Sequence, residues 1–474
     1  MKKVFALLVT IALAAVVILP ALVHGQNPSR NAASPAASSA DAGAPFVADE
    51  LIVQYKEGTD FVAASEARHA VGALTKKELR AEATGQGGRL EVVKLQSGLA
   101  VAEAVRILRN DPRVAFAEPN YIVKHQLVST DTYFTNGNLW GMYGDATTPA
   151  NQFGSQAAEA WARGNVGSNT VIVGVIDEGM DYEHIDLATN IWTNPFDLPD
   201  GVDNDGNGYT DDVHGFDFAN NDNNVYDGTR PDDFETDAHG THVAGTIGAL
   251  SNGRGVVGVN WNVTIISGKF LNPGGGTISD AIEAVNYFTD LKTRHGLNIV
   301  AINNSWGGGG YSQALHDAII RAAKANILFT AAAGNGNLAG VGQNNDKRAS
   351  YPSNYNTTQG TSTQTAASYD SVIAVAALTS TGALAGYSNY GATTVDIGAP
   401  GSAVWSTTPN NTLSRFDGTS MATPHVTGGI ALYAATHPTA TPSQIKSAVF
   451  STGTATSSLS GKTTTGRRLN VSTF

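Results

Sequence analysis

Three side chains that could act together in nucleophilic catalysis stand where one kind of segment gives way to another. The apolar run VIVGVID ends in Asp177, and His239 precedes the helix-like pattern GTHVAGTIGAL. Ser420 lies in DGTSMATPHVTGG, at the start of another helical pattern. A serine can attack a carbonyl carbon when a histidine takes its proton and an aspartate orients the imidazole. The sequence therefore predicts an acid, a base and a nucleophile in the order Asp177, His239, Ser420.

The start of a helix suits Ser420 for either of two roles. Small and apolar residues follow it every four positions, as on a buried helix face, at Ala422, Val426, Ile430 and Ala434. Pro424 is tolerated there because the N–H groups of a first turn have no intrahelical acceptors. Those N–H groups and the helix dipole would stabilise an oxyanion in front of the serine. Serine is also a favoured helix cap, so this stretch alone leaves a capping role open.

The order of the three residues excludes two known arrangements. Esterase-type α/β-hydrolases run Ser, Asp, His, and chymotrypsin-like enzymes run His, Asp, Ser; neither order matches. A zinc protease is not indicated either, because His239 and His242 are three residues apart rather than four and have no glutamate between them. We expect His242 to be a packed helix residue.

An acidic loop, from Asp200 to Asp217, contains the pattern D-x-D-x-N-G between Asp203 and Gly208. Alternating oxygen ligands with a glycine at the sixth position are typical of a loop that wraps Ca²⁺. The predicted ligands are Asp203, Asp205, Asn207, the Tyr209 carbonyl, and Asp211 or Asp212. Position twelve is His214 rather than glutamate, so this is not an EF-hand, and a solvated loop of Asx turns is the alternative. Oxygen ligands and the absence of cysteine exclude soft metals.

Residues 127–474 have the pattern of one α/β domain. Helical patterns, such as ISDAIEAVNYFTDL and YSQALHDAIIRAAKA, alternate with short apolar runs. These strand candidates are TVIVGVID, TIISGKFL, NIVAINNS, ILFTAAAGN, SVIAVAAL and TVDIGAPG. The runs are continuous and rich in β-branched residues, as in strands covered on both faces. The pattern predicts a doubly wound, mostly parallel sheet, which binds its ligands at the carboxyl ends of the strands. A late helix is predicted after Thr441, with a capping box completed by Gln444.

A smaller unit precedes this domain, at residues 45–126. Strand candidates begin at Glu50 and Leu90, helical patterns cover residues 60–74 and begin at Ala100, and RVAFAE and YIVKH are two further strand candidates. We interpret the unit as a compact α+β module of βαββαβ order.

The first residues indicate export. Residues 1–25 combine a lysine pair with a long apolar run and read as a signal peptide, followed by an Ala-, Ser- and Pro-rich linker at residues 26–44. An uncleaved membrane anchor is the alternative. The 474-residue chain has a net charge of −12 and no cysteine. The charge disfavours nucleic acid and anionic membrane surfaces as partners, and an exported chain without disulfides must gain stability from its core or from bound metal. We expect a secreted protein with no membrane contact after signal cleavage.

Four blocks resemble the signature motifs of subtilisin-like serine proteases: VIDEG, HGTHVAGT, AAAGN and GTSMATPHVTG. The order Asp, His, Ser is the subtilisin order, and the resemblance extends from about Asn138 to Val471. It implies that Asp177 orients, His239 is the general base and Ser420 the nucleophile, with the amide of Asn335 as an oxyanion donor. It also implies an inhibitory propeptide at residues 45–126 and a monomeric zymogen that hydrolyses polypeptides.

The same resemblance implies the substrate-binding segments. Two edges would hold a peptide as an added strand, the glycine run of Gly274, Gly275 and Gly276 and the segment of Ser305, Trp306 and Gly307. Tyr351 would lie near the pocket for the P1 residue, on the amino side of the cleaved bond. Ser350, Tyr351 and Pro352 include no carboxylate, so we expect broad cleavage after large apolar residues. Asp217, Asn220, Asp222 and Asn224 resemble a second calcium loop of thermostable family members.

One departure from the family pattern lies beside the first motif residue. Position 178 is glutamate, where the family usually has serine or threonine, and a second carboxylate pointing inward would raise the pKa of His239 or Asp177. The alternative function is a secreted calcium-binding adhesion or scaffold protein on a catalytically dead protease fold. The presence of Asp177, His239, Asn335 and Ser420 disfavours it.

Overall fold

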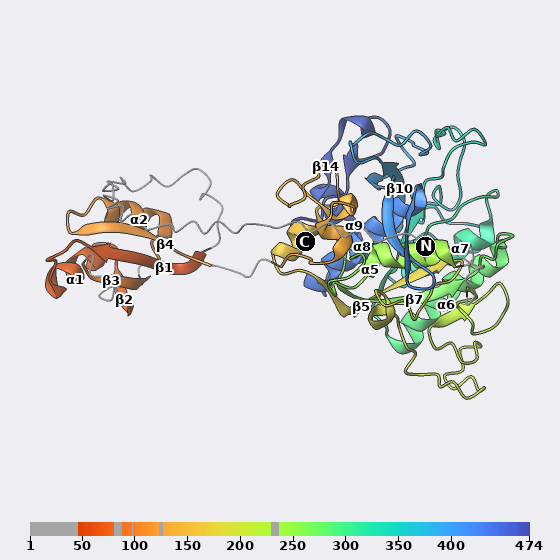
Figure 1. Ribbon diagram of the computed structural model, residues 1–474, viewed down its shortest axis with the longest axis horizontal. Coiled ribbons are helices and arrows are strands. Elements are labelled where there is room, and N and C mark those ends of the chain that lie inside the picture. Colours follow the sequence, from red (N-terminus) through yellow and green to blue (C-terminus); the bar gives the residue numbers. More distant parts are fainter. Residues whose placement is uncertain (1–45, 80–87, 97, 123–126, 229–236) are drawn as a thin grey trace, which may run out of the picture. The chain divides into compact units, whose positions relative to one another are not determined.

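The computed structural model describes residues 46–79, 88–96, 98–122, 127–228 and 237–474. The chain divides into two compact units between Val123 and Lys124, and each is described by itself (Figure 1). The predicted signal peptide and linker, residues 1–44, lie outside the described residues and stay predictions. In the part of the chain that is described, no helix is long and apolar enough to cross a membrane.

The N-terminal unit is a four-stranded antiparallel sheet with two helices. Its elements are β1 (Phe46–Tyr55), α1 (Phe61–His69), β2 (Ala73–Leu79), β3 (Leu90–Leu95), α2 (Val101–Arg109) and β4 (Val114–Tyr121). The strand order is β2-β3-β1-β4, and all three neighbouring pairs are antiparallel. α2 buries Val101, Ala104, Val105 and Leu108, the spacing of one helix face. The predicted α+β module of βαββαβ order is confirmed, although β2 is not among the predicted strand candidates.

Two boundaries within this unit differ from the prediction. The helix predicted over residues 60–74 ends at His69, and β2 begins at Ala73, because Gly72 adopts the left-handed conformation (φ +61°) that ends helices. β4 (Val114–Tyr121) covers nearly all of the candidate RVAFAE but only the first residue of YIVKH, since Ile122 lies beyond the strand and residues 123–125 lie outside the described residues.

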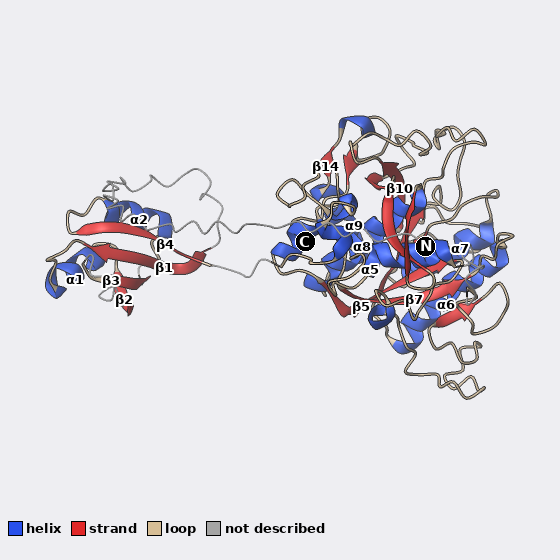
Figure 2. Cartoon of the chain, viewed as in Figure 1, coloured by secondary structure: helices blue, strands red, loops and turns tan. Residues whose placement is uncertain are grey.

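The C-terminal unit is a nine-stranded sheet with helices on both faces (Figure 2). Its strand order is β14-β15-β11-β10-β9-β8-β5-β7-β6, and every neighbouring pair is parallel except β14 with β15. The strands are β5 (Gly167–Asp177), β6 (Gly215–Asp217), β7 (Asn262–Lys269), β8 (Ile299–Asn304), β9 (Leu328–Ala332), β10 (Val372–Leu378), β11 (Ile397–Pro400), β14 (Thr454–Ala455) and β15 (Arg467–Arg468). β12 (Val404–Thr408) and β13 (Thr412–Phe416) form a separate antiparallel pair. The predicted doubly wound, mostly parallel sheet is confirmed.

Helices cover both faces of this sheet. They are α3 (Thr132–Thr135), α4 (Ala157–Ala162), α5 (Ala238–Gly248), α6 (Ile278–His295), α7 (Gln313–Lys324), α8 (Thr419–Thr436) and α9 (Pro442–Thr452), of which α9 begins with the predicted capping box. In β5, Val173 and Val175 join the core that contains α5 and α8 residues, whereas Ile172 and Ile176 join the core that contains α6 and α7 residues. Burial on both faces explains why the apolar runs are continuous.

The parallel arrangement brings several strand ends to one edge of the sheet. β5 ends at Asp177, its neighbours β7 and β8 end at Lys269 and Asn304, and β9 ends at Ala332. α5 starts close to the end of β5, because a Cβ placed on Gly240 would lie 2.0 Å from the carbonyl oxygen of Gly179. Glycine therefore permits the backbone contact that brings the first turn of α5 to this edge.

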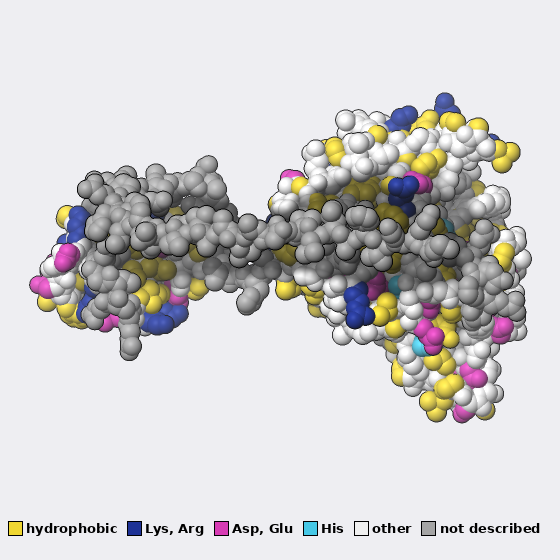
Figure 3. Space-filling model, in the orientation of Figure 1, with side chains coloured by type: hydrophobic (Ala, Val, Ile, Leu, Met, Phe, Trp, Pro, Cys, Tyr) yellow, Lys and Arg dark blue, Asp and Glu magenta, His cyan; other side chains and the backbone are white. Residues whose placement is uncertain are grey.

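The visible face of the C-terminal unit is largely uncharged. In Figure 3, backbone, uncharged polar and hydrophobic atoms make up most of what is drawn in colour or white, with acidic and basic side chains scattered among them. This matches a chain in which only 15% of residues are charged.

Candidate active site

Asp177 and His239 meet at the carboxyl edge of the sheet. Asp177 is the last residue of β5 and is buried, and His239 is the second residue of α5. The Nδ1 nitrogen of His239 lies 2.8 Å from Oδ1 of Asp177, which also accepts the backbone N–H of Glu178 at 2.9 Å. Because the carboxylate engages Nδ1, the other ring nitrogen, Nε2, is the one available for proton transfer.

Glu178 takes part in holding His239. Its Oε1 accepts the backbone N–H of His239 at 2.5 Å, at the start of α5. Asp237, the residue before the helix, makes no capping bond to it, because its carboxylate accepts from the Lys269 ammonium at 2.7 Å and from the N–H groups of Asp227 and Gly228. Glu178 thus satisfies a helix N–H group that Asp237 leaves free.

The two carboxylates change the protonation of the histidine. Burial lowers the pKa of His239, but Asp177 and Glu178 outweigh burial and raise that pKa to about 9. Burial and the neighbouring Asp177 raise the pKa of Glu178 itself to about 7. His242, by contrast, is fully buried and stacked on Phe416, and burial lowers its pKa to about 3, in keeping with the predicted packing role.

Ser420 is the second residue of α8, and Gly418, not Ser420, is the residue at the cap position. The capping role that the sequence left open is therefore wrong. The Ser420 hydroxyl donates to the carbonyl of Ser305 at 2.9 Å, and the hydroxyl of Ser305 donates back to the carbonyl of Ser420 at 2.8 Å. Between the described side chains of Ser420 and His239 there is no hydrogen bond; such catalytic contacts often tighten only when substrate binds.

Two N–H donors lie close to the Ser420 hydroxyl, the side-chain amide of Asn335 and the backbone N–H of Ser420 itself. The side-chain oxygen of Asn335 accepts the backbone N–H of Thr419 at 2.8 Å and its hydroxyl at 2.9 Å. Since a backbone N–H can only donate, this contact fixes the amide so that its NH₂ group points away from Thr419. The backbone N–H of Ser420 has no acceptor among the described residues. Together these donors could bind an oxyanion.

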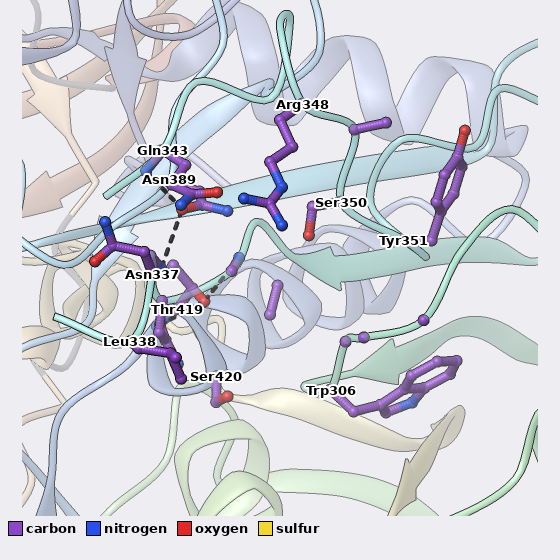
Figure 4. A pocket seen from close by; sticks show the side chains of 18 of the residues that line it. Trp306, Asn337, Leu338, Gln343, Arg348, Ser350, Tyr351, Asn389, Thr419 and Ser420 are labelled. Atoms are coloured by element: carbon purple, nitrogen blue, oxygen red, sulfur yellow. Dashed lines mark hydrogen bonds between the residues drawn. The ribbon is translucent and has the colours of Figure 1, made fainter. Parts of the chain in front are cut away.

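A cavity of about 910 Å³ opens beside Ser420 (Figure 4). We call it the Ser420 cavity. Its lining residues are Trp306, Gly307, Gly308, Gly309, Ala332, Gly334, Asn335, Gly336, Asn337, Leu338, Ala339, Gln343, Arg348, Ala349, Ser350, Tyr351, Asn389, Thr419 and Ser420. Two of its walls are joined by a hydrogen bond of 3.1 Å from the N–H of Gly308 to the carbonyl of Tyr351.

The structure brings only some of the predicted substrate residues to this cavity. Trp306, Gly307 and Tyr351 line it, whereas Ser305 is buried and contacts the backbone of Ser420. The glycines at positions 274, 275 and 276 lie in an exposed turn between β7 and α6 and do not line it, so their role stays a prediction.

Sequence reasoning missed three residues here. Thr419 orients Asn335 and is adjacent to Ser420, a position that could have drawn attention to it. Arg348 and Asn389 line the cavity without belonging to any motif.

The predicted calcium loop is held together by hydrogen bonds. Asp203 accepts the N–H groups of residues 206, 207 and 208, and Asp211 accepts those of residues 200 and 201. Tyr209 packs its ring on Phe216, Phe218 and Tyr287.

Three of the predicted ligands converge. The amide nitrogen of Asn207 lies 3.4 Å from Oδ2 of Asp205 and 3.1 Å from Oδ2 of Asp212, which is fully buried. Burial raises the pKa of Asp212 to about 7, although the hydrogen bond from the Tyr287 hydroxyl acts in the opposite direction and lowers this pKa. These side chains carry carboxylate and amide oxygens, which are the ligand atoms that fit a hard cation such as Ca²⁺.

The second predicted cluster forms a tight turn. Asp217 is buried and accepts the N–H of Ala219 and both the N–H and the amide of Asn220, and Asp222 accepts the N–H of Asn224. In the described ranges, no three His, Asp or Glu side chains are placed so that they could hold a metal ion. Both calcium assignments remain predictions.

Comparisons with known proteins give matches for both units of the chain. A sequence model of the Subtilase family matches residues 168–468, and one of the Fervidolysin N-terminal prodomain matches residues 32–120. Subtilisin DY from Bacillus licheniformis is 36% identical over 300 residues, which cover 63% of this chain and 89% of that protein.

Two further relatives extend the comparison. An extracellular protease from Xanthomonas campestris pv. campestris is 33% identical over 438 residues, covering 86% of this chain and 69% of that protein. The solved structure of a protease from Pseudoalteromonas arctica matches with a TM-score of 0.52 and 29% identity, covering 73% of this chain and 96% of that one.

The contribution of Glu178 to the pKa of His239 is testable by NMR titration. Glu178→Gln keeps an oxygen for the His239 N–H and removes the negative charge, so we expect the pKa of His239 to fall from about 9. The signal can be assigned with a His239→Gln variant, since the chain has 11 histidines. Glu183→Gln, which removes an exposed charge nearby, should leave the pKa unchanged. An unchanged or higher pKa in Glu178→Gln would contradict this electrostatic account.

Proposed function

Because the chain belongs to the subtilase family of serine endopeptidases, we propose that Asp177, His239 and Ser420 form its catalytic triad. The observation that carries this proposal is the 2.8 Å hydrogen bond between His239 and the buried Asp177. Ser420 turns its hydroxyl from the Ser305 carbonyl to Nε2 of His239 and attacks the peptide carbonyl. His239 takes the proton and then gives it to the leaving amine, and Asp177 stabilises the imidazolium.

The negative oxygen that forms in this attack would be bound by two donors. The Asn335 amide and the Ser420 backbone N–H supply them, and neither loses its proton near neutral pH. Free donors beside the serine favour an active enzyme over a scaffold on a dead protease fold.

Substrates are polypeptides that bind in extended form. Gly274, Gly275 and Gly276 would flank the peptide on one side and Ser305, Trp306 and Gly307 on the other, because glycine lets a peptide backbone approach closely. Trp306 and Tyr351 give the Ser420 cavity aromatic surface, which supports broad specificity with large apolar P1 residues.

The precursor is a zymogen with a prodomain. We propose the boundaries 1–25 for a signal peptide, 26–44 for a linker, 45–126 for an inhibitory and folding-assisting propeptide and 127–474 for the peptidase. The mature enzyme would be secreted, extracellular and monomeric, with no nucleic-acid partner and no membrane contact after signal cleavage.

Calcium would act as a structural ion. Its candidate ligands are Asp203, Asp205, Asn207, the Tyr209 carbonyl, and Asp211 or Asp212, with a second set at Asp217, Asn220 and Asp222. A divalent cation would neutralise carboxylates that repel one another within one loop. It would stabilise the folded loop and take no part in the chemistry.

Replacement of the nucleophile tests the proposed function. Ser420→Ala should lower kcat/KM by more than about 1000-fold, because no other group would form the acyl intermediate. In an extract without other proteases, its precursor should also stay unprocessed, as followed by intact mass. Ser443→Ala, which removes an exposed serine hydroxyl from α9, should mature and cleave normally. Normal maturation of Ser420→Ala would show that the enzyme does not process itself.

Chelation tests the calcium proposal. With the active serine blocked to prevent autolysis, a chelator should lower the melting temperature of the mature enzyme. Calcium at a hundredfold excess over its Kd contributes about 2.7 kcal/mol, or about 4 °C for a domain of this size.

Two variants distinguish calcium that binds at this loop from calcium that binds elsewhere on the protein. Asp205→Ala should remove most of the response to added calcium, whereas Glu183→Ala, at an exposed carboxylate outside the loop, should keep it. A melting curve that the chelator leaves unmoved would show that the loop is only a hydrogen-bonded turn.

A further inference from the structure

One wall of the Ser420 cavity carries a cation without a partner. Arg348 lines the cavity and is exposed, and within the described residues its guanidinium makes no hydrogen bond, ion pair or aromatic contact. Figure 4 shows its side chain reaching into the cavity, between Asn389 and Ser350. An arginine whose fork of N–H groups faces open space is available to a ligand.

The groups around Arg348 are also donors. The side-chain oxygen of Asn389 accepts the N–H groups of Gly336 and Gln343, at 3.1 and 2.8 Å, which leaves its NH₂ group free of any described acceptor. The hydroxyl of Ser350 likewise has no hydrogen-bond partner among the described residues. Asp and Glu are absent from the residues that line the cavity. This wall therefore offers hydrogen-bond donors and one positive charge, and no carboxylate neutralises them.

We propose that Arg348 selects a carboxylate in the Ser420 cavity, so that the enzyme cleaves after glutamate in preference to glutamine. The inference rests on the proposed protease function and deepens it, because it adds an acidic residue to the large apolar P1 residues. Arg348 is a specificity-determining residue here and takes no part in bond cleavage.

The geometry favours the P1 side chain as the group that meets Arg348. The same cavity is lined by Ser420 and Asn335, which would hold the reacting carbonyl, and by Arg348. A side chain that leaves the reacting residue and enters the cavity therefore approaches Arg348. Glutamate can place its methylene groups between the residues that line the cavity and its carboxylate on the guanidinium, where two parallel N–H···O bonds can form.

Charge also decides which side chains are rejected. A lysine or arginine at P1 would bring a second cation towards Arg348 with no acidic group in the cavity lining to pair it. Glutamine has the size of glutamate but lacks its charge. The ratio of glutamate to glutamine cleavage therefore isolates the charge contribution.

The test uses peptides that differ only at P1, assayed at a pH where glutamate is ionised. We expect kcat/KM for P1 glutamate to exceed that for glutamine by about tenfold or more, the order expected of a hydrogen bond to a charged group. Arg348→Ala should bring the two close to equality and leave P1 phenylalanine within about threefold of the original enzyme. Arg348→Glu should reverse the preference and favour P1 lysine.

A neighbouring residue gives the matched control. Lys347 is exposed, has the same charge and does not line the cavity, so Lys347→Ala should keep the glutamate preference. Equal cleavage after glutamate and glutamine by the unmodified enzyme, or a preference that survives Arg348→Ala, would overturn the proposal. Because phenylalanine reports catalysis independently of Arg348, failure to cleave any of the peptides would instead count against the proposed function.

Discussion

The arrangement of the site depends on one buried ion pair, between Lys269 and Asp237. Lys269 ends β7 and is completely buried, and its ammonium also donates to the carbonyl of Glu178, directly after β5. Asp237 immediately precedes α5, so a single cation joins two strand ends to the start of the helix that carries His239. Loss of one partner of a buried pair costs about 3–5 kcal/mol, because it leaves a buried charge uncompensated. This constraint positions the start of α5 for the 2.8 Å hydrogen bond between Asp177 and His239.

Carboxylates lie at His239 and hydrogen-bond donors lie at Ser420, as the proposed acyl transfer requires. Asp177 and Glu178 lie beside the imidazole that would become positive in the proposed reaction, and both raise the pKa of His239. The Asn335 amide and the N–H of Ser420 are the donors proposed for the negative oxygen. Thr419 fixes that amide through two hydrogen bonds, so it need not reorient during the reaction.

The sequence predicted what depends on local pattern and on motif order. Apolar runs indicated the sheet, and the blocks around Asp177 and His239 indicated two distant residues that form a hydrogen bond. It could not predict contacts between distant segments, such as Lys269 with Asp237 or Arg348 in the Ser420 cavity. It also did not predict that α1 ends at His69, where the left-handed backbone of Gly72 outweighs helix propensity. A loop pattern also cannot tell whether carboxylates such as Asp203 bind a cation or their own backbone N–H groups, because both need the same oxygens.

The central claim is that Ser420 is a nucleophile activated by His239. Labelling of the mature enzyme with a fluorophosphonate, followed by peptide mass spectrometry, tests it most directly. The account predicts one phosphonyl group per molecule, on Ser420, at a rate that rises with pH as His239 loses its proton and that collapses in His239→Ala. A folded enzyme that takes no label, or takes it on another serine, would contradict the account.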